Sequence, residues 1–369
     1  MNYDYLIVGA GFAGSVLAER ISSVLDKTVL LVERRDHIGG NAYDYYDDNG
    51  VLVHKYGAHI FHTDHSDVWQ YVNKFSKWND YKHKVLVSVD GKKVTLPINL
   101  KTVNTLLNKN FTESELIEYF NSVRSTDLVI KNSRDVIISQ VGEFLYEKIF
   151  KNYTFKHWGV YAQDLLPEVT RRIPVRFNNN EIYFSNIYQG LPVDGYTMLF
   201  EHMLDSKNIT VLLNTDYKYA ERAYTFDRLI FTGPIDYYFD YIHGRLPYRS
   251  LRFEFESHNC QYFQEAAVVN FPNEHDYTRI VEAKHMTLQS SLVTTIAKEY
   301  PSNIGEPYYP MPMLTSHEIY RKYEEEALKL KSVYFVGRLA EYKYYDMDMV
   351  IKRALDLFDQ ISQKDDKVY

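Results

Sequence analysis

The sequence predicts an α/β fold in which one nucleotide-binding domain is assembled from three separate stretches of the chain. A β-α-β pattern fills the first 33 residues, short apolar strands recur further along, and helical and antiparallel segments interrupt them. The expected boundaries are 1–78, 191–243 and 312–369 for the nucleotide-binding domain, 99–148 for a small helical domain, and 79–98, 149–190 and 244–311 for an antiparallel β-sheet domain. Because these domains are interleaved, we expect a ligand crevice between them.

The β-α-β pattern begins with an apolar strand that leads into a glycine-rich run at residues 9–14, Gly-Ala-Gly-Phe-Ala-Gly. The pattern then predicts an amphipathic helix over Ser15–Leu25 and a second strand over Val29–Val32. Glu33 follows this strand directly. A strand, a glycine-rich turn, a helix and a carboxylate at this distance together favour a dinucleotide site.

Each glycine of the run has a physical role in such a site. Gly9 permits the tight turn, Gly11 lets the backbone approach a pyrophosphate, and Gly14 lets the helix pack closely on the strand. The phosphates then lie at the positively polarised start of the helix. The Glu33 carboxylate can accept hydrogen bonds from a ribose diol.

The rest of the chain alternates between helical and strand patterns. Capping residues open two of the expected helices, with Thr112 three residues before Glu115 and Ser133 at the start of 134–149. The expected segments are a helix at 68–75, a hairpin at 84–95 that turns at Asp90-Gly91, helices over 100–149, strand-rich stretches at 175–190 and 248–285, strands at 209–213, 228–231 and 333–336, and a last helix at 347–361.

The composition narrows the function classes. The 369 residues are 45% hydrophobic with a net charge of −7, which argues against a nucleic-acid partner. No apolar stretch is long enough to span a membrane, and the immediate strand at the N-terminus predicts no signal peptide. The single cysteine, Cys260, fits a reducing compartment, so the expected location is the cytoplasm. Some of the 34 tyrosines can line a sugar or nucleotide site.

The sequence favours FAD over NAD as the dinucleotide. A second glycine pair, Gly39-Gly40, comes soon after Glu33 and lets the backbone approach another part of a long cofactor. Gly233 ends a middle strand and Gly337-Arg338 ends a late one. Together these motifs are typical of flavoproteins that bind FAD in an extended conformation, with Arg338 near the pyrophosphate or the flavin carbonyl groups.

Four further motifs narrow the family. They are Tyr-Gly-Ala-His-Ile-Phe-His-Thr at 56–63, Tyr-Thr-Phe-Lys-His-Trp-Gly at 153–159, Arg-Ile-Pro-Val-Arg-Phe at 172–177, and Gly-Arg-Leu at 337–339 with Tyr-Tyr-Asp-Met-Asp at 344–348. These motifs, in this order along the chain, resemble those of the bacterial UDP-galactopyranose mutase family, and the resemblance covers nearly the whole chain. The resemblance implies a discontinuous Rossmann-like FAD-binding domain, a homodimer, and an isomerase that needs an external reductant.

The resemblance also implies the reaction. UDP-galactopyranose and UDP-galactofuranose interconvert through an adduct between the sugar and N5 of reduced FAD, without net redox change, for cell-surface polysaccharide synthesis. Asp346 and Met347 begin the last helix, whose positive end would favour the anionic reduced flavin. The implied catalytic residues are Arg172 and Arg279, which bind the diphosphate from opposite sides, and His62 beside the flavin.

The remaining site residues are assigned in the same way. Tyr153 is expected to stack on uracil, and Trp158 to belong to a mobile lid. The implied substrate-binding residues are Tyr153, Trp158, Arg172, Tyr183, Arg249, Arg279, Tyr309, Tyr344 and His83. The implied cofactor-binding residues are Gly9, Gly11, Phe12, Ala13, Gly14, Glu33, Arg34, Gly40, Asn41, Gly57, His59, Ile60, Gly233, Arg338, Tyr344, Asp346 and Met347.

Three departures from the family pattern leave the substrate preference open. Ala58 replaces a proline, His83 an asparagine near the sugar, and Ile149 a phenylalanine on the uracil side. The first two are compatible with a mutase that prefers UDP-N-acetylgalactosamine. The cofactor motifs by themselves also fit an FAD-dependent amine oxidase-like oxidoreductase, or a non-catalytic protein that binds FAD or a UDP-sugar. The histidines at 59, 62 and 65 lack the spacing of a metal motif, so no metal is predicted.

Overall fold

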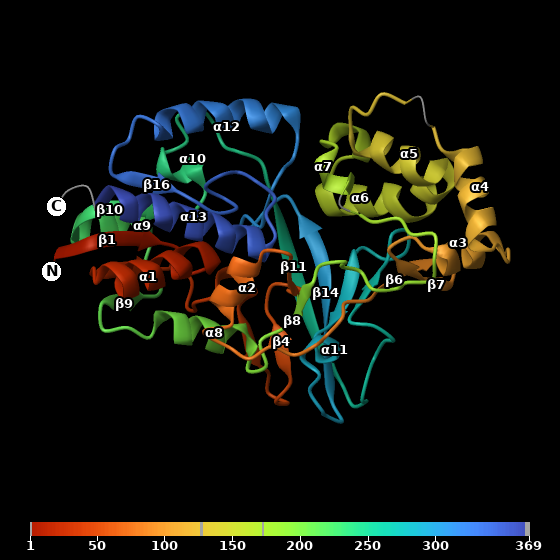
Figure 1. Ribbon diagram of the computed structural model, residues 1–369, viewed down its shortest axis with the longest axis horizontal. Helices are drawn as coiled ribbons and strands as arrows, with labels where there is room; N and C mark the ends of the chain where they lie inside the picture. Colours follow the sequence, from red (N-terminus) through yellow and green to blue (C-terminus); the bar gives the residue numbers. More distant parts are fainter. Residues whose placement is uncertain (1, 126–127, 172, 366–369) are drawn as a thin grey trace.

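A five-stranded parallel sheet forms the half of the molecule that contains β1 and α13, the first and last described elements (Figure 1). In the computed structural model, which describes residues 2–125, 128–171 and 173–365, three of these strands (β2, β9 and β16) are almost entirely apolar. Apolar strands of this kind are typical of parallel sheets covered on both faces. The strand order is β16 (Val333–Phe335), β10 (Thr225–Phe231), β1 (Asn2–Val8), β2 (Val29–Val32) and β9 (Ile209–Leu212).

Helix α1 (Phe12–Leu25) connects β1 to β2 and packs against α8 (Gly195–Leu204) and α13 (Met347–Asp365). The predicted β-α-β unit is therefore confirmed, with the helix beginning inside the glycine-rich run. All five strands fall within 1–78, 191–243 and 312–369. The exact domain boundaries stay a prediction.

A second sheet of seven strands lies beside the first (Figure 1). Neighbouring strands are antiparallel except β12 and β6, which run parallel. Their order is β15 (Tyr309–Pro310), β11 (Tyr248–His258), β14 (Thr294–Ser302), β13 (Arg279–Glu282), β12 (Val268–Asn270), β6 (Val85–Val89) and β7 (Lys92–Leu96). The predicted hairpin is β6–β7, and Asp90 and Gly91 have the positive φ values, 50° and 75°, of a tight hairpin turn.

Helices cover the β6–β7 end of this sheet (Figure 1). They are α3 (Leu100–Leu107), α4 (Glu113–Val123), α5 (Ser133–Leu145), the π-helical turn η2 (Tyr146–Phe150), α6 (Lys151–Trp158), the 3₁₀ turn η3 (Ala162–Asp164) and α7 (Glu168–Arg171). Both α7 and η3 pack against α5. The helical layer therefore continues beyond residue 148.

The capping predictions have different outcomes. Thr112 and Glu115 form the predicted capping box of α4. The cap of α5 is Asn132, whose side chain accepts a hydrogen bond from the Asp135 amide at 3.0 Å. Ser133 is the first helical residue, and its hydroxyl donates to the Leu166 carbonyl. The prediction of Ser133 as the cap is wrong by one position, because two good capping residues stand side by side.

The prediction of a strand-rich stretch at 175–190 is also wrong. In this described stretch the one strand is β8 (Tyr188–Gly190), which pairs with β5 (Phe61–Thr63). Upstream, Asn178 and Asn180 accept hydrogen bonds from the backbone amides of residues 180 and 182. Local side-chain bonds of this kind compete with strand pairing.

The other elements complete the chain around the two sheets. They are η1 (Gly40–Ala42), β3 (Asp44–Tyr46), β4 (Leu52–His54), α2 (Ser66–Val72), α9 (Tyr217–Ala223), α10 (Ile235–Tyr238), α11 (Lys284–Thr287) and α12 (Leu314–Ala327). Within the described ranges, no helix combines the length and apolar character needed to cross a membrane.

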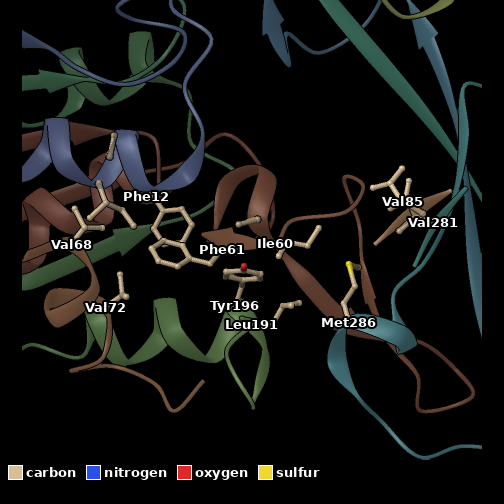
Figure 2. Close-up of a cluster of buried hydrophobic side chains, with 14 of the residues drawn as sticks. Phe12, Ile60, Phe61, Val68, Val72, Val85, Leu191, Tyr196, Val281 and Met286 are labelled. Carbon is tan, nitrogen blue, oxygen red and sulfur yellow. The ribbon is translucent and has the colours of Figure 1, made fainter. Parts of the chain in front are cut away.

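One continuous apolar core joins the two sheets (Figure 2). Phe12 at the start of α1 packs against Tyr196 of α8 with ring centroids 6.2 Å apart. The Tyr196 hydroxyl donates to the His59 carbonyl at 3.2 Å. The cluster extends to Val85 and Val281 of the seven-stranded sheet. The segment around His59 is thus fixed where the two halves meet.

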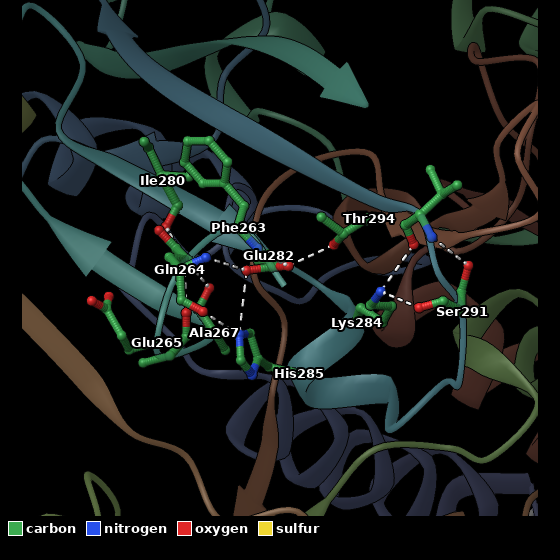
Figure 3. Close-up of polar contacts among 12 residues, drawn as sticks. Phe263, Gln264, Glu265, Ala267, Ile280, Glu282, Lys284, His285, Ser291 and Thr294 are labelled. Atoms are coloured by element: carbon green, nitrogen blue, oxygen red, sulfur yellow. Dashed lines mark hydrogen bonds and ion pairs between the residues drawn. The ribbon is translucent and has the colours of Figure 1, made fainter. Parts of the chain in front are cut away.

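A buried polar cluster fixes the far end of β13 (Figure 3). The Glu282 carboxylate is fully buried and accepts from the Phe263 and Gln264 amides, both at 3.0 Å, and from the Thr294 hydroxyl. The neighbouring Lys284 ammonium donates to two backbone carbonyls, at 2.8 and 2.9 Å. Because buried charges need such partners, this cluster specifies one position for β13, whose first residue is Arg279.

Candidate functional site

A cavity of about 560 Å³ lies at the carboxyl ends of the parallel strands. This is where open α/β sheets bind ligands. Its wall contains Val8, Val32, Phe231 and Gly337, which end or follow four of the five strands. The predicted cofactor residues in the wall are Gly9, Gly11, Phe12, Ala13, Glu33, Arg34, Gly40, Asn41, His59, Gly233, Arg338 and Met347.

Bare backbone forms one side of this cavity. A Cβ atom on Gly40 would lie 2.9 Å from the Gly11 Cα, so the two glycine loops approach more closely than a side chain at position 40 allows. Gly9 has φ of 98°, and its Cβ would lie 2.2 Å from the Thr232 hydroxyl oxygen. Helix α1 starts at this point without a side-chain cap. An uncapped helix start beside backbone glycines fits a pyrophosphate.

Two backbone hydrogen bonds fix the Glu33 carboxylate at the cavity wall. One carboxylate oxygen accepts from the Ala10 amide and the other from the Arg35 amide, both at 3.0 Å. Arg34, beside it, forms an ion pair with Glu306 of the loop that precedes β15. Residues 305–308 of this loop also line the cavity, so the seven-stranded sheet contributes to the same site.

A second cavity of about 470 Å³ adjoins the first. The two cavities share His59, Arg338 and Met347. Met347 is the first residue of α13, so the positive end of a 19-residue helix lies at this junction. The second wall contains His62, predicted as catalytic, and the predicted substrate-binding residues His83, Tyr153, Trp158, Tyr183, Arg279, Tyr309 and Tyr344.

Arg279 is the cation that the β-sheet presents to this cavity. Its Nε donates to Oε2 of the fully buried Glu299 at 2.7 Å. Burial lowers the Arg279 pKa, but the charge of Glu299, the hydrogen bond to it and the neighbouring hydroxyls of Tyr153 and Tyr309 together outweigh burial and hold that pKa well above the ordinary value. Arg279 is therefore a permanent guanidinium cation beside the ligand space.

Aromatic rings surround Arg338 at the junction. Trp158 is 4% exposed and packs 5.7 Å from Tyr344 and 6.2 Å from Tyr309. The Arg338 guanidinium lies over both tyrosine rings and donates from Nε to the Tyr345 carbonyl at 3.1 Å. Burial raises the pKa of Tyr309, so its hydroxyl remains a proton donor at neutral pH.

Two histidines of the site are held neutral by burial. Burial lowers the pKa of His59 to about 3 and that of His83 to about 3. These two residues therefore contribute hydrogen bonding and shape, while the positive charge comes from the arginines. His62 and His83 both stack on the Phe184 ring, with centroids 3.7 Å and 5.6 Å from it.

Comparison with known proteins identifies the family. A family model described as GLF, UDP-galactopyranose mutase, matches residues 148–344, and one for an NAD(P)-binding Rossmann-like domain matches residues 7–75. A probable UDP-galactopyranose mutase of Klebsiella pneumoniae is 37% identical over 366 residues, which cover 97% of this chain and 94% of the relative. The chain belongs to the UDP-galactopyranose mutase family.

Other relatives agree. A dTDP-fucopyranose mutase of Escherichia coli is 36% identical, with 95% of this chain and 96% of that protein covered. The solved structure of a reduced UDP-galactopyranose mutase matches with a TM-score of 0.79 at 16% identity, covering 98% of this chain and 94% of that one. A putrescine oxidase shares the fold with a TM-score of 0.61 at 12% identity. These findings confirm the predicted family, the fold class and the FAD-dependent class of the chain.

Five of the predicted cofactor-binding residues do not line the first cavity. Ile60, Tyr344 and Asp346 line the second cavity and not the first, and Tyr344 is also one of the predicted substrate-binding residues. Gly14 lets the helix pack closely on the strand, as the sequence predicts, because its Cβ would lie 1.9 Å from the Gly9 carbonyl oxygen. Gly57 lies against Glu299, whose Oε1 would be 2.5 Å from a Cβ there. Arg172 lies outside the described residues, and its assignment stays a prediction.

Arg249 is not brought into the wall of either cavity. Its side chain is 4% exposed and donates to the His157 carbonyl at 2.8 Å, to the Lys156 carbonyl at 3.0 Å and to the Asn303 side chain. These carbonyls belong to the last turn of α6, just before Trp158. Arg249 therefore holds the Trp158 segment through the backbone carbonyls that precede it. Its positive charge also complements the C-terminal end of α6.

The motifs missed several wall residues. Arg35, Thr215, Asp216 and Glu306 line the first cavity, and Phe184, Asn186 and Asn270 line the second. Arg35 lies two residues after the predicted cofactor residue Glu33, so its position in the sequence indicates that it also lines the cavity. The others come from loops or strand ends whose sequence carries no local signal.

Proposed function

We propose that this chain is a UDP-galactopyranose mutase, an isomerase that interconverts UDP-galactopyranose and UDP-galactofuranose with FAD bound. The observation that carries the proposal is the junction at His59, Arg338 and Met347, where the cavity beside the glycine-rich run meets a second cavity lined by Arg279 and tyrosines. A sugar nucleotide in the second cavity can place its sugar at this junction and its diphosphate beside Arg279.

The first cavity fits FAD, with the pyrophosphate at the start of α1 and a ribose at Glu33. The chemistry that reduced FAD supplies when bound is nucleophilic, toward the anomeric carbon of the sugar. The start of α13 at the junction would favour negative charge there.

The other residues serve the sugar nucleotide. Arg279 would stabilise the charge that the diphosphate gains as its bond to the sugar breaks. Tyr309 and Tyr344 would donate hydrogen bonds to phosphate oxygens, and Tyr153, whose pKa burial raises to about 12, would present a neutral ring to the base. Trp158 covers this region and would exclude water. Arg172, outside the described part of the chain, is proposed as the second diphosphate cation.

An oxidoreductase function receives less support. An amine oxidase-like enzyme would use the cavity beside the glycine-rich run but would have no need of a guanidinium cation fixed by a buried carboxylate. The preference between galactose and N-acetylgalactosamine depends on the sugar end, where His83 and Phe184 lie. A cytoplasmic location, a homodimer and an external reductant for FAD are further parts of the proposal.

Anaerobic assays test the function directly. Protein loaded with FAD and reduced with dithionite should convert UDP-galactofuranose to UDP-galactopyranose, and the oxidised protein should be nearly inactive. UDP-N-acetylgalactosamine, assayed in parallel, settles the sugar preference. Reduced protein that binds UDP yet forms neither ring isomer would contradict the proposal.

A further inference from the structure

Lys156 connects two walls of the substrate cavity that are distant in the sequence. It lies on α6, and other residues of this helix, among them Tyr153 and Trp158, line the cavity. Its side chain does not line the cavity itself. The Lys156 ammonium instead donates to four carbonyl oxygens of the β12–β13 loop, those of Phe271 and, at 3.1, 3.2 and 3.1 Å, of Glu274, His275 and Tyr277.

The ends of this loop belong to the binding site. Asn270 precedes the loop, Arg279 follows it, and the two are paired across β12 and β13. Both line the substrate cavity. The Asn273 side chain adds a second tie, because it accepts from Asn152 at 2.9 Å and donates to the Lys148 carbonyl at 3.0 Å.

The geometry is that of a cation site. Several backbone carbonyl oxygens directed at one centre are the arrangement that replaces the hydration shell of a monovalent cation. An ammonium group has three N–H donors, so the four oxygens share them. A neutral apolar side chain here would leave these carbonyl groups without their donor, and the loop would have to open toward water.

We propose that Lys156 is a positioning residue whose ammonium group fills this four-carbonyl site and so holds the β12–β13 loop, with Arg279 at its end, against α6. The inference deepens the proposed function, on which it rests for the identity of the ligand. Lys156 acts through Arg279 and the α6 residues and touches no substrate.

The surroundings make this contact sensitive to pH. Burial lowers the pKa of Lys156 to about 8, while Glu274 and Asp276 oppose that effect. The rings of His275 and Tyr277, two residues of the loop, stack on each other. The Lys298 ammonium of β14 lies 5.9 Å from the centre of the Tyr277 ring. The charge is therefore present at pH 7 and is lost above pH 8, and UDP should then bind more weakly.

The test compares Lys156→Met with Lys151→Met in FAD-loaded protein. Lys151 is on the same helix and pairs with Glu147 at the surface, so its loss should leave the dissociation constant of UDP within twofold. Lys156→Met should weaken UDP binding by about 10- to 100-fold, as expected for loss of a charged hydrogen-bonding group, and should abolish the pH dependence between 7 and 9. In Lys156→Ala, ammonium or potassium ions should recover part of the affinity, and tetramethylammonium should not.

Equal affinities of the two Met variants, or a loss in Lys156→Ala that ammonium and potassium leave unchanged, would overturn the proposal. If the variants do not fold, unmodified protein still tests it, because UDP affinity that stays constant from pH 7 to 9 contradicts the inference. Wild-type protein that binds UDP without catalysing ring contraction would reject the proposed function and leave this inference standing.

Discussion

Arg279 and Glu299 form the charged pair on which the substrate cavity depends. Arg279 Nε donates to Glu299 Oε2 at 2.7 Å, and Glu299 has no exposed surface. Burial raises the pKa of Glu299, and the neighbouring guanidinium opposes that rise. The pair fixes the guanidinium on β13, facing the cavity, so the cation is already oriented before a ligand arrives.

Arg279→Ala should lower turnover by at least about 100-fold, because the charge developing on the diphosphate loses its cation. It should also destabilise the protein by about 3–5 kcal/mol through the unpaired buried carboxylate. Adding Glu299→Gln should recover stability without recovering turnover. Steady-state assays and urea unfolding measure both effects, with the exposed Arg252→Ala of β11 as control. Full activity in Arg279→Ala would discredit the assigned site.

Gly11→Ala should weaken FAD binding without unfolding the protein. Gly11 has φ of −82°, which alanine adopts easily, and the new Cβ would lie at an ordinary 3.6 Å from Gly40 Cα. The methyl group would occupy the side of the cavity where a pyrophosphate must approach the backbone. We expect at least a tenfold loss of FAD affinity, measured by flavin fluorescence, with unfolding of the FAD-free protein unchanged. Normal FAD affinity would argue against the pyrophosphate position.

The cofactor half of the site could be predicted from the sequence because local backbone requirements determine it. Gly9, Gly11 and Glu33 act within one β-α-β unit, and their spacing is set by the strand, the turn and the helix between them. The same locality explains the correct capping box at Thr112. Local sequence does not show which of Asn132 and Ser133 is the N-cap of α5, because either residue type can cap a helix.

The substrate half could be predicted only by resemblance, since its walls meet through tertiary contacts. Arg249 stands in a strand pattern that does not say whether its side chain reaches the cavity or, as found, the carbonyls of α6. Lys156 gives no sequence signal for its four carbonyl partners, which lie more than 100 residues away. Such pairings depend on the fold as a whole.

Arg249→Met should raise the KM for the sugar nucleotide by about tenfold and leave FAD content unchanged. The two α6 carbonyls and the Asn303 side chain would lose their donor, so the Trp158 segment would no longer be held over the cavity. The exposed Arg222→Met on α9 serves as control. Quenching of tryptophan fluorescence by UDP reports mainly Trp158, because Trp69 and Trp78 line neither cavity. An unchanged KM together with unchanged quenching would assign Arg249 to folding alone.

Asp346→Asn should make the potential of bound FAD more positive by tens of millivolts. The change removes a negative charge next to the start of α13, where Met347 lines both cavities, so an anionic reduced flavin would become easier to form. Dye-linked reductive titration measures the potential. Asp359→Asn, near the other end of the same helix, is the matched control. A potential within a few millivolts of the wild type would show that this helix start does not tune the flavin.

Acid should destabilise the protein steeply through three buried histidines. Burial lowers the pKa of His54 to about 4 and those of His59 and His83 to about 3, from 6.5 in an exposed histidine. As the pH falls, these histidines are protonated in the unfolded chain but stay neutral in the folded chain. Their contribution to the free energy of unfolding is therefore fully present above pH 6.5 and is lost as the pH drops toward 4. Each histidine should contribute roughly 1.4 kcal/mol per pH unit in this window. Urea unfolding from pH 7 to 4.5 measures how steeply the free energy of unfolding changes with pH. His83→Asn should reduce this slope by about one histidine's share. An identical slope would mean that His83 is protonated in the folded protein.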